Sequence, residues 1–283
     1  MRYILTFLFI AFSIEVLAQI NCEAYRHEGD SLKYKACLKA EEIRPYYQFS
    51  REAQAGLDAA LAIDSTFDYA YKVKSIAYLK SGDFIEWKRL MDKAVGLDPK
   101  ANLGYRGWCR FQFFRDYEGA IKDIERLDSL LVSDIGYSQN GTYHLKVALG
   151  LCNKMLGNTD KAISLISEQI KKNEEINFLG EYDYLHLGVL YFQKSEYEKA
   201  LAAFQSQSKE SELAENQYYL ALTYKALQQT ENFRKAILKA QELYIAKQRM
   251  FDPYSNPLDK IYLSDIEKEL DVSTARNSQY IRE

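Results

Sequence analysis

The chain has 283 residues, of which 47% are hydrophobic and 27% are charged, so it carries enough apolar material for a sizeable core. Its formal net charge of -3 gives no electrostatic reason to bind a polyanion, and we therefore expect no nucleic acid partner. Only 13 glycines and 4 prolines occur, which favours long helices over a turn-rich β fold.

The first 18 residues have the layout of a secretory signal peptide. Arg2 precedes an apolar run over 3–14, and small or apolar side chains stand before a cleavage site that follows Ala18. The run is shorter than the roughly 20 residues that cross a bilayer. We expect an exported chain, periplasmic or secreted, with no membrane insertion after cleavage. A lipid anchor on Cys22 is the alternative, although Asn21 matches that motif poorly.

Export changes how the 4 cysteines are interpreted. In an oxidising compartment Cys22 and Cys37 can form a disulfide that fastens the N-terminus to the first helix. Cys109 and Cys152 lie in apolar helical stretches, where a free cysteine is typically a small buried hydrophobe. No cysteine or histidine cluster has metal-site spacing, so we expect no metal and no cofactor.

A helical pattern repeats along the chain with a period in the thirties. Small or apolar residues recur at spacings of 34, 33, 42, 38 and 33, namely at Ala53, Trp87, Ala120, Ala162, Ala200 and Phe233. A second series lies 12 or 13 residues before the last five of these, at Ser75, Gly107, Gly150, Gly188 and Ala221. The two linked series predict tandem helical hairpins, each with small residues where its two helices cross.

These hairpins resemble the tetratricopeptide repeat (TPR) family. The unit over 182–208 follows the family's order of aromatic, Leu-Gly, Tyr and turn residues, and then Tyr197, Ala200 and Phe204 on the second helix. The resemblance implies an all-α, right-handed α-solenoid of tandem helix-turn-helix repeats with N- and C-terminal caps.

The pattern also sets the expected domain boundaries. After the signal peptide come four regions: an N-terminal cap and degenerate first repeat over 19–66, five repeats over 67–244, a loop insert within them near 134–142, and a C-terminal part over 245–283. That last part is expected to contain an extended segment, a capping helix and a frayed tail.

The resemblance implies a non-catalytic scaffold that binds a peptide or a partner protein in its concave groove. The first helices of TPR arrays line this groove, and the positions expected there are Tyr69, Lys72, Tyr105, Arg106, Phe113, His144, Tyr182, His186, Tyr218 and Tyr219. Aromatic and cationic side chains of this kind dominate interface energetics. We expect Tyr105, Arg106 and Phe113 to form the most energetic patch, with Trp108 and Phe111 in the core. An alternative is that several tyrosines only fill space between repeats.

Two other functions stay open. No hydrolase, P-loop or dinucleotide motif occurs, so catalysis is not expected. A periplasmic metal-binding or enzymatic accessory protein using the His144/His186 region is the second hypothesis, because both histidines fall on expected first helices. The third is a structural array that assembles with itself through its convex face.

Overall fold

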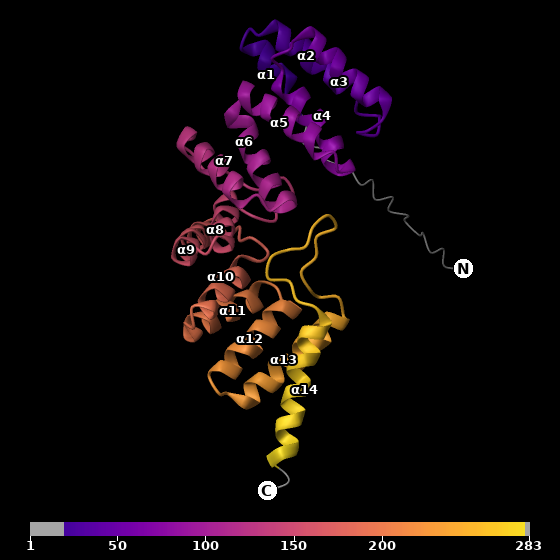
Figure 1. The fold of residues 1–283 in the computed structure, drawn as a ribbon. Coiled ribbons are helices and arrows are strands. Elements are labelled where there is room, and N and C mark those ends of the chain that lie inside the picture. The colour runs from indigo at the N-terminus through magenta and orange to yellow at the C-terminus, as the bar shows by residue number, and fades with distance from the viewer. Residues whose placement is uncertain (1–19, 281–283) are drawn as a thin grey trace, which may run out of the picture. The chain divides into compact units, whose positions relative to one another are not determined.

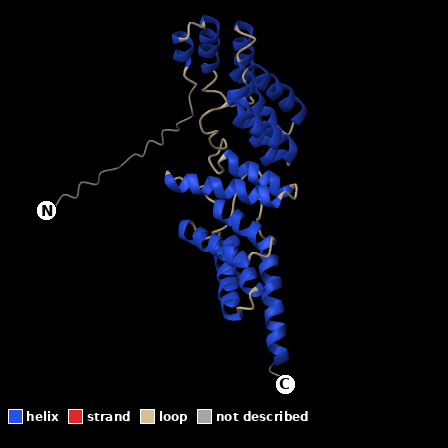
Figure 2. Ribbon diagram, turned by 90° about the vertical axis from the view of Figure 1, so that its left-hand side faces the viewer, coloured by secondary structure: helices blue, strands red, loops and turns tan. Residues whose placement is uncertain are grey.

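A computed structural model describes residues 20–280, so the expected signal peptide over 1–18 lies outside the described residues. Within this range the chain forms helices joined by turns and loops, with no β-strand (Figure 2). It divides into two compact units, one ending at Asp98 and the other beginning at Pro99.

The described part of unit 1, residues 20–98, contains five helices. They are α1 (Cys22–His27), α2 (Ser31–Glu41), α3 (Arg51–Ile63), α4 (Asp68–Ser81) and α5 (Phe84–Leu97). The helices pair in chain order, α2 with α3 and α4 with α5, as expected of hairpins (Figure 1).

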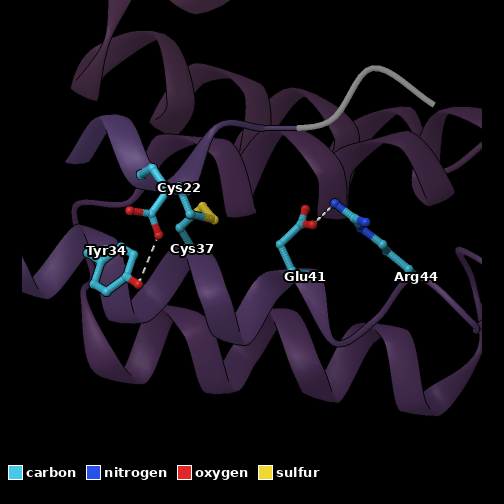
Figure 3. The surroundings of a disulfide bond; sticks show 6 residues. Cys22, Tyr34, Cys37, Glu41 and Arg44 are labelled. Carbon is cyan, nitrogen blue, oxygen red and sulfur yellow. Dashed lines mark hydrogen bonds and ion pairs between the residues drawn. A yellow bond between two sulfur atoms is a disulfide. The ribbon is translucent and has the colours of Figure 1, made fainter. Parts of the chain in front are cut away.

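A disulfide fastens the start of unit 1. Cys22 on α1 and Cys37 on α2 are bonded (Figure 3). Both are buried in a cluster that includes alanines of α2, α3 and α4. Beside this bond Tyr34 donates a hydrogen bond to Glu23 over 3.1 Å. The short helix α1 is thereby joined covalently to the first hairpin. It is the same cysteine pair that sequence reasoning joins.

Unit 2 holds four further hairpins and a last helix. Its elements are α6 (Pro99–Cys109), the π-helical turn η1 (Arg110–Phe114), α7 (Tyr117–Leu130), α8 (Leu145–Met155), α9 (Thr159–Glu175), α10 (Asp183–Gln193), α11 (Tyr197–Glu210), α12 (Ala214–Ala226), α13 (Thr230–Ile245) and α14 (Leu263–Tyr280). Each even-numbered helix from α6 to α12 packs against the helix that follows it.

Local sequence explains where these hairpins turn. Gly82 has a φ of +82°, the left-handed conformation that commonly ends a helix, and the next residue, Asp83, accepts a hydrogen bond from the amide of Glu86 over 3.1 Å. Asp116 caps α7 in the same way through the amide of Gly119, over 2.9 Å. One helix therefore stops and the next starts within two or three residues.

The small residues lie where two helices cross, as their spacing predicts. A Cβ built on Gly150 of α8 would stand 2.6 Å from Ile166 of α9, and one on Gly188 of α10 would overlap the ring of Phe204 on α11. Contacts this short do not occur between real atoms. Only glycine lets these helices approach so closely.

The insert near 134–142 and the C-terminal tail are both more regular in structure than their composition indicates. The insert near 134–142 is tied to the helices, because Tyr137 donates a hydrogen bond to Asn173 of α9 over 3.3 Å and forms a backbone bridge with His144, the residue before α8. The tail expected to fray from Asp271 is helical as far as Tyr280. No proline or glycine interrupts this stretch, so nothing in its sequence stops α14.

Candidate interaction surface

Successive first helices of unit 2 contact one another: α6 contacts α8, α8 contacts α10 and α10 contacts α12. We call the side of these helices and of η1 that carries Gln112, Lys154, His186 and Glu215 the first-helix face. A non-helical stretch over 248–262, which we call segment 248–262, lies against this face before the chain enters α14. Figure 1 shows it as the gold loop beside α10. Side chains from all four first helices hold it.

The segment begins on α12. The carbonyl of Gln248 accepts a hydrogen bond from the amide of Ala214 over 2.9 Å, and the amide of Met250 donates to a carboxylate oxygen of Glu215 over 3.0 Å. Glu215 and Met250 are both buried. Burial raises the pKa of Glu215, and the amide of Met250 opposes this rise.

The middle of the segment is held from η1. The amide nitrogen of the Gln112 side chain donates to the hydroxyl of Ser255 over 2.6 Å and to Asp252 over 3.3 Å. The guanidinium of Arg115, one residue after η1, donates to the backbone carbonyl of Asn256. A π-helical turn adds a residue to the helix and is frequent at functional sites. Here it precedes the turn that carries Arg115 to the segment.

The end of the segment is held by charge. Two side chains on first helices contact the carboxylate of Asp259. Nζ of Lys154 on α8 lies 2.6 and 2.7 Å from its two oxygens, and Nδ1 of His186 on α10 lies 2.7 Å from one of them. The three side chains are 9%, 6% and 0% exposed, in that order. Burial alone would raise the pKa of Asp259, but the charge of Lys154 and the hydrogen bond from His186 outweigh it and lower this pKa to about 2.

The hydrogen bonds of His186 assign its protons. Nδ1 donates to Asp259, and Nε2 lies 3.2 Å from the hydroxyl of Tyr143, which donates to it when the ring is neutral. Both ring nitrogens are therefore engaged within the protein. His186 lies where the sequence places it, on a first helix, and its partner is the chain's own segment.

His144 is placed differently from the expectation. It is the residue before α8, where Nδ1 accepts a hydrogen bond from the amide of Lys146 over 3.1 Å and Nε2 donates to Asp134 over 2.9 Å. The side chain is fully buried. Burial lowers the pKa of His144, and the hydrogen bond to Asp134 opposes this. His144 therefore caps a helix and anchors the insert instead of lining an open groove.

Neither histidine offers a metal an open nitrogen in this arrangement. Among the residues that the structure describes, no three histidine, cysteine, aspartate or glutamate side chains gather in a set that could hold a metal ion.

Arg106 is also engaged. Its guanidinium makes a two-point contact with Asp123 of α7, with N–O distances of 2.8 and 2.6 Å, and its side chain is only 12% exposed. Arg110 approaches the same carboxylate over 3.0 Å. Tyr105 is buried beside Trp108. Arg106 thus joins α6 to α7, Tyr105 is buried on α6, and neither is an exposed anchor for a partner.

The other expected groove residues vary in exposure. Phe113 is half-buried against Trp108, while Trp108 and Phe111 are buried, as their assignment to the core requires. Tyr182 is buried, which raises its pKa, and the backbone of Phe251 in segment 248–262 hydrogen-bonds to it. The remaining four are half-buried: Tyr69 and Lys72 in unit 1, and Tyr218 and Tyr219 in unit 2.

Sequence reasoning did not identify five residues that hold the segment or belong to it: Gln112, Arg115, Lys154, Glu215 and Asp259. Lys154 and Glu215 both stand on helices that the sequence predicts as first helices of repeats. A search for charged residues on these predicted helices could therefore have found both. Nothing local marks Asp259 as a partner of His186, because 73 residues separate them.

Comparison with known proteins identifies the architecture. No protein-family model matches the sequence, and no curated protein matches it. The crystal structure of PilW, described as a widely conserved type IV pilus biogenesis factor, aligns with a TM-score of 0.59 at 15% sequence identity and covers 84% of this chain and 98% of PilW. PilF of Pseudomonas aeruginosa aligns with a TM-score of 0.57 at 14% identity and covers 87% of this chain and 99% of PilF.

The fold is that of a TPR solenoid. The tandem hairpins, the close crossings at small residues and the alignment over most of both chains agree on it. At such low identity the similarity concerns the fold. In residues 20–280 of this TPR solenoid, no helix is long and apolar enough to span a bilayer.

Proposed function

We propose that the protein is a non-catalytic interaction scaffold that binds an extended peptide or a partner protein in the concave groove of its TPR solenoid. One observation carries the proposal: the first-helix face of unit 2 already accommodates a non-helical stretch of chain, segment 248–262. Side chains spaced along four helices, and not a single pocket, recognise this stretch. Such an arrangement suits a peptide and not a small substrate.

The proposal can be tested by capture from the native cell envelope. The tagged wild-type protein and an Arg115→Ala/Lys154→Ala variant are compared, with Lys161→Ala as the matched control because Lys161 forms an exposed ion pair with Glu125. We expect a protein that co-purifies with the wild type and the control but is lost with the double variant, while circular dichroism shows all three folded. Equal recovery with all three would place binding elsewhere, for example on the convex face.

We propose further that the scaffold is exported. The signal-like sequence over 1–18 supports this, and so does the bond between Cys22 and Cys37, since disulfides persist in oxidising compartments. Intact-mass measurement of the protein from its native host should show a chain that starts at Gln19. A diacylglyceryl adduct on Cys22 would instead identify a lipoprotein.

A further inference from the structure

We propose that segment 248–262 is a built-in ligand, and that a partner displaces it with an acidic extended peptide whose Asp or Glu side chain takes the place of Asp259 between Lys154 and His186. The inference rests on the proposed function and gives the partner's chemistry. It also makes binding conditional, because the site is filled until the segment leaves.

The carboxylate site is formed by the solenoid and not by the segment. Lys154 comes from α8 and His186 from α10, and both side chains are almost excluded from water. Without Asp259 the Lys154 ammonium would be a buried charge with no carboxylate beside it, which is costly. A peptide that restores a carboxylate is favoured, and one that brings Lys or Arg to the site is opposed by like charge.

The middle of the segment is attached in a way that permits release. Phe251 and Tyr254 point into solvent, being 74% and 72% exposed, so they contribute little apolar burial. The buried apolar side chains stand at the two ends, Met250 and Ile261. Between them the segment receives polar contacts from Gln112, Arg115, Lys154 and His186, and its Phe251 backbone hydrogen-bonds to Tyr182; another peptide can reproduce contacts of this kind.

The covalent attachment of segment 248–262 makes it a strong competitor of any free peptide. A covalently attached segment competes at an effective concentration on the order of millimolar. A free peptide therefore binds with an apparent Kd equal to its intrinsic Kd divided by the small fraction of molecules in which the site is open, so its binding is weakened. Weakening the attached segment should strengthen binding of a peptide added from solution.

The experiment uses the full chain and a fluorescent synthetic peptide with the sequence of residues 248–262, followed by anisotropy. The chains compared are the wild type, Asp259→Ala, Asp259→Ala/Lys154→Ala and, as a matched control, Asp160→Ala. Asp160 forms an exposed ion pair with Lys194 outside the segment's contacts. A second peptide carries Asn at the position of Asp259.

We expect the Asp259→Ala chain to bind the first peptide at least about tenfold more tightly than the wild type and the Asp160→Ala control do, since losing one buried charge contact weakens the attached segment by that much or more. The Asn peptide and the chain lacking Lys154 should each lose at least about tenfold. Equal affinity for the wild type and Asp259→Ala, or no preference for Asp over Asn, would overturn the proposal.

A measurement on the wild type decides the matter if Asp259→Ala does not fold. The amides of Tyr254 and Ser255, which donate to Asp252 within the segment, should exchange hydrogen faster than amides of α8 and α10 through an opening that leaves those helices intact. Exchange only together with α8 and α10 would make the segment a fixed part of the fold and refute its role as a displaceable ligand. Loss of capture in the Arg115→Ala/Lys154→Ala variant would still support the scaffold function in that case.

Discussion

Arg106 shows how a single side chain stabilises the hairpin of α6 and α7. Its two-point contact with Asp123 is nearly excluded from water. Arg106→Ala should lower the free energy of unfolding by about 3 kcal/mol, since removing one partner of a buried pair leaves the other charge uncompensated. Arg110 stays 3.0 Å from Asp123 and limits the loss. Urea unfolding of the variant measures it.

The matched control for this prediction is Arg126→Ala. Arg126 is an exposed arginine on α7, and surface substitutions usually change stability by less than about 0.5 kcal/mol. If both variants unfolded at the wild-type midpoint, the contact between Arg106 and Asp123 would contribute nothing to stability.

At the scale of elements, close helix crossings are the feature most sensitive to added volume. Gly188→Ala puts a methyl group into the ring of Phe204, which is fully buried. Overpacking of this kind costs about 1 to 3 kcal/mol, and α10 and α11 have to separate to relieve it. A lower thermal midpoint in calorimetry is the expected result.

Gly96→Ala is the opposite case in the same kind of helix. A Cβ at Gly96 of α5 meets nothing within 4 Å, so the methyl group only restricts the unfolded chain and favours the helix. We expect stabilisation by about 0.5 to 1 kcal/mol. Similar effects of the two substitutions would show that crossing distance does not set the positions of glycine in this repeat.

The sequence predicts elements well where the information is local. The spacing of small residues places the crossings at Gly150 and Gly188, and the Gly82-Asp83 pair places a turn. A regular helical period stops applying after α6, because the π-helical turn η1 adds a residue to the helix. Side chains beyond Cys109, including Phe113, therefore face directions that a regular 3.6-residue period does not give.

Long-range polar pairing is what the sequence could not supply. Helical periodicity puts Arg106 and His186 on first helices but does not reveal that Asp123 and Asp259 meet them. The partner of His186 comes from a proline-containing stretch in the C-terminal part, expected only to be extended. Whether a charged side chain serves binding or stability depends on that partner, which only the folded chain shows.

At the scale of the whole molecule, the two units should respond separately to loss of the disulfide. Cys22→Ala/Cys37→Ala removes a link across 15 residues, which contributes about 3 kcal/mol in the chain-entropy model. We expect amides of α2 and α3 to exchange hydrogen faster, while those of α8 and α10 in unit 2 keep their wild-type rates. Equal acceleration in both units would show that they unfold together.

Acid should loosen unit 2 through Asp259. The pKa of this carboxyl is lowered to about 2 in the folded protein, against about 3.9 for an unperturbed aspartate. A carboxyl whose pKa is lower when folded stabilises the fold above its unfolded pKa, and this stabilisation is lost as the pH falls through the folded value. The window is therefore about pH 4 to 2. Lys154 and His186 contact Asp259 directly, and the hydroxyl of Tyr143, whose pKa is raised by burial, contacts His186.

The measurement compares the wild type with Asp259→Asn by urea unfolding at several pH values. Trp108 of unit 2 serves as the fluorescent reporter after Trp87 of unit 1 is replaced by Phe, because the chain has only 2 tryptophans. The wild type should be more stable than Asp259→Asn by about 2 kcal/mol above pH 4, and the difference should shrink toward zero near pH 2. A difference that stays constant over this range would mean that the carboxylate charge does not hold the segment. Contacts from Gln112, Arg115 and Glu215 would then account for its attachment.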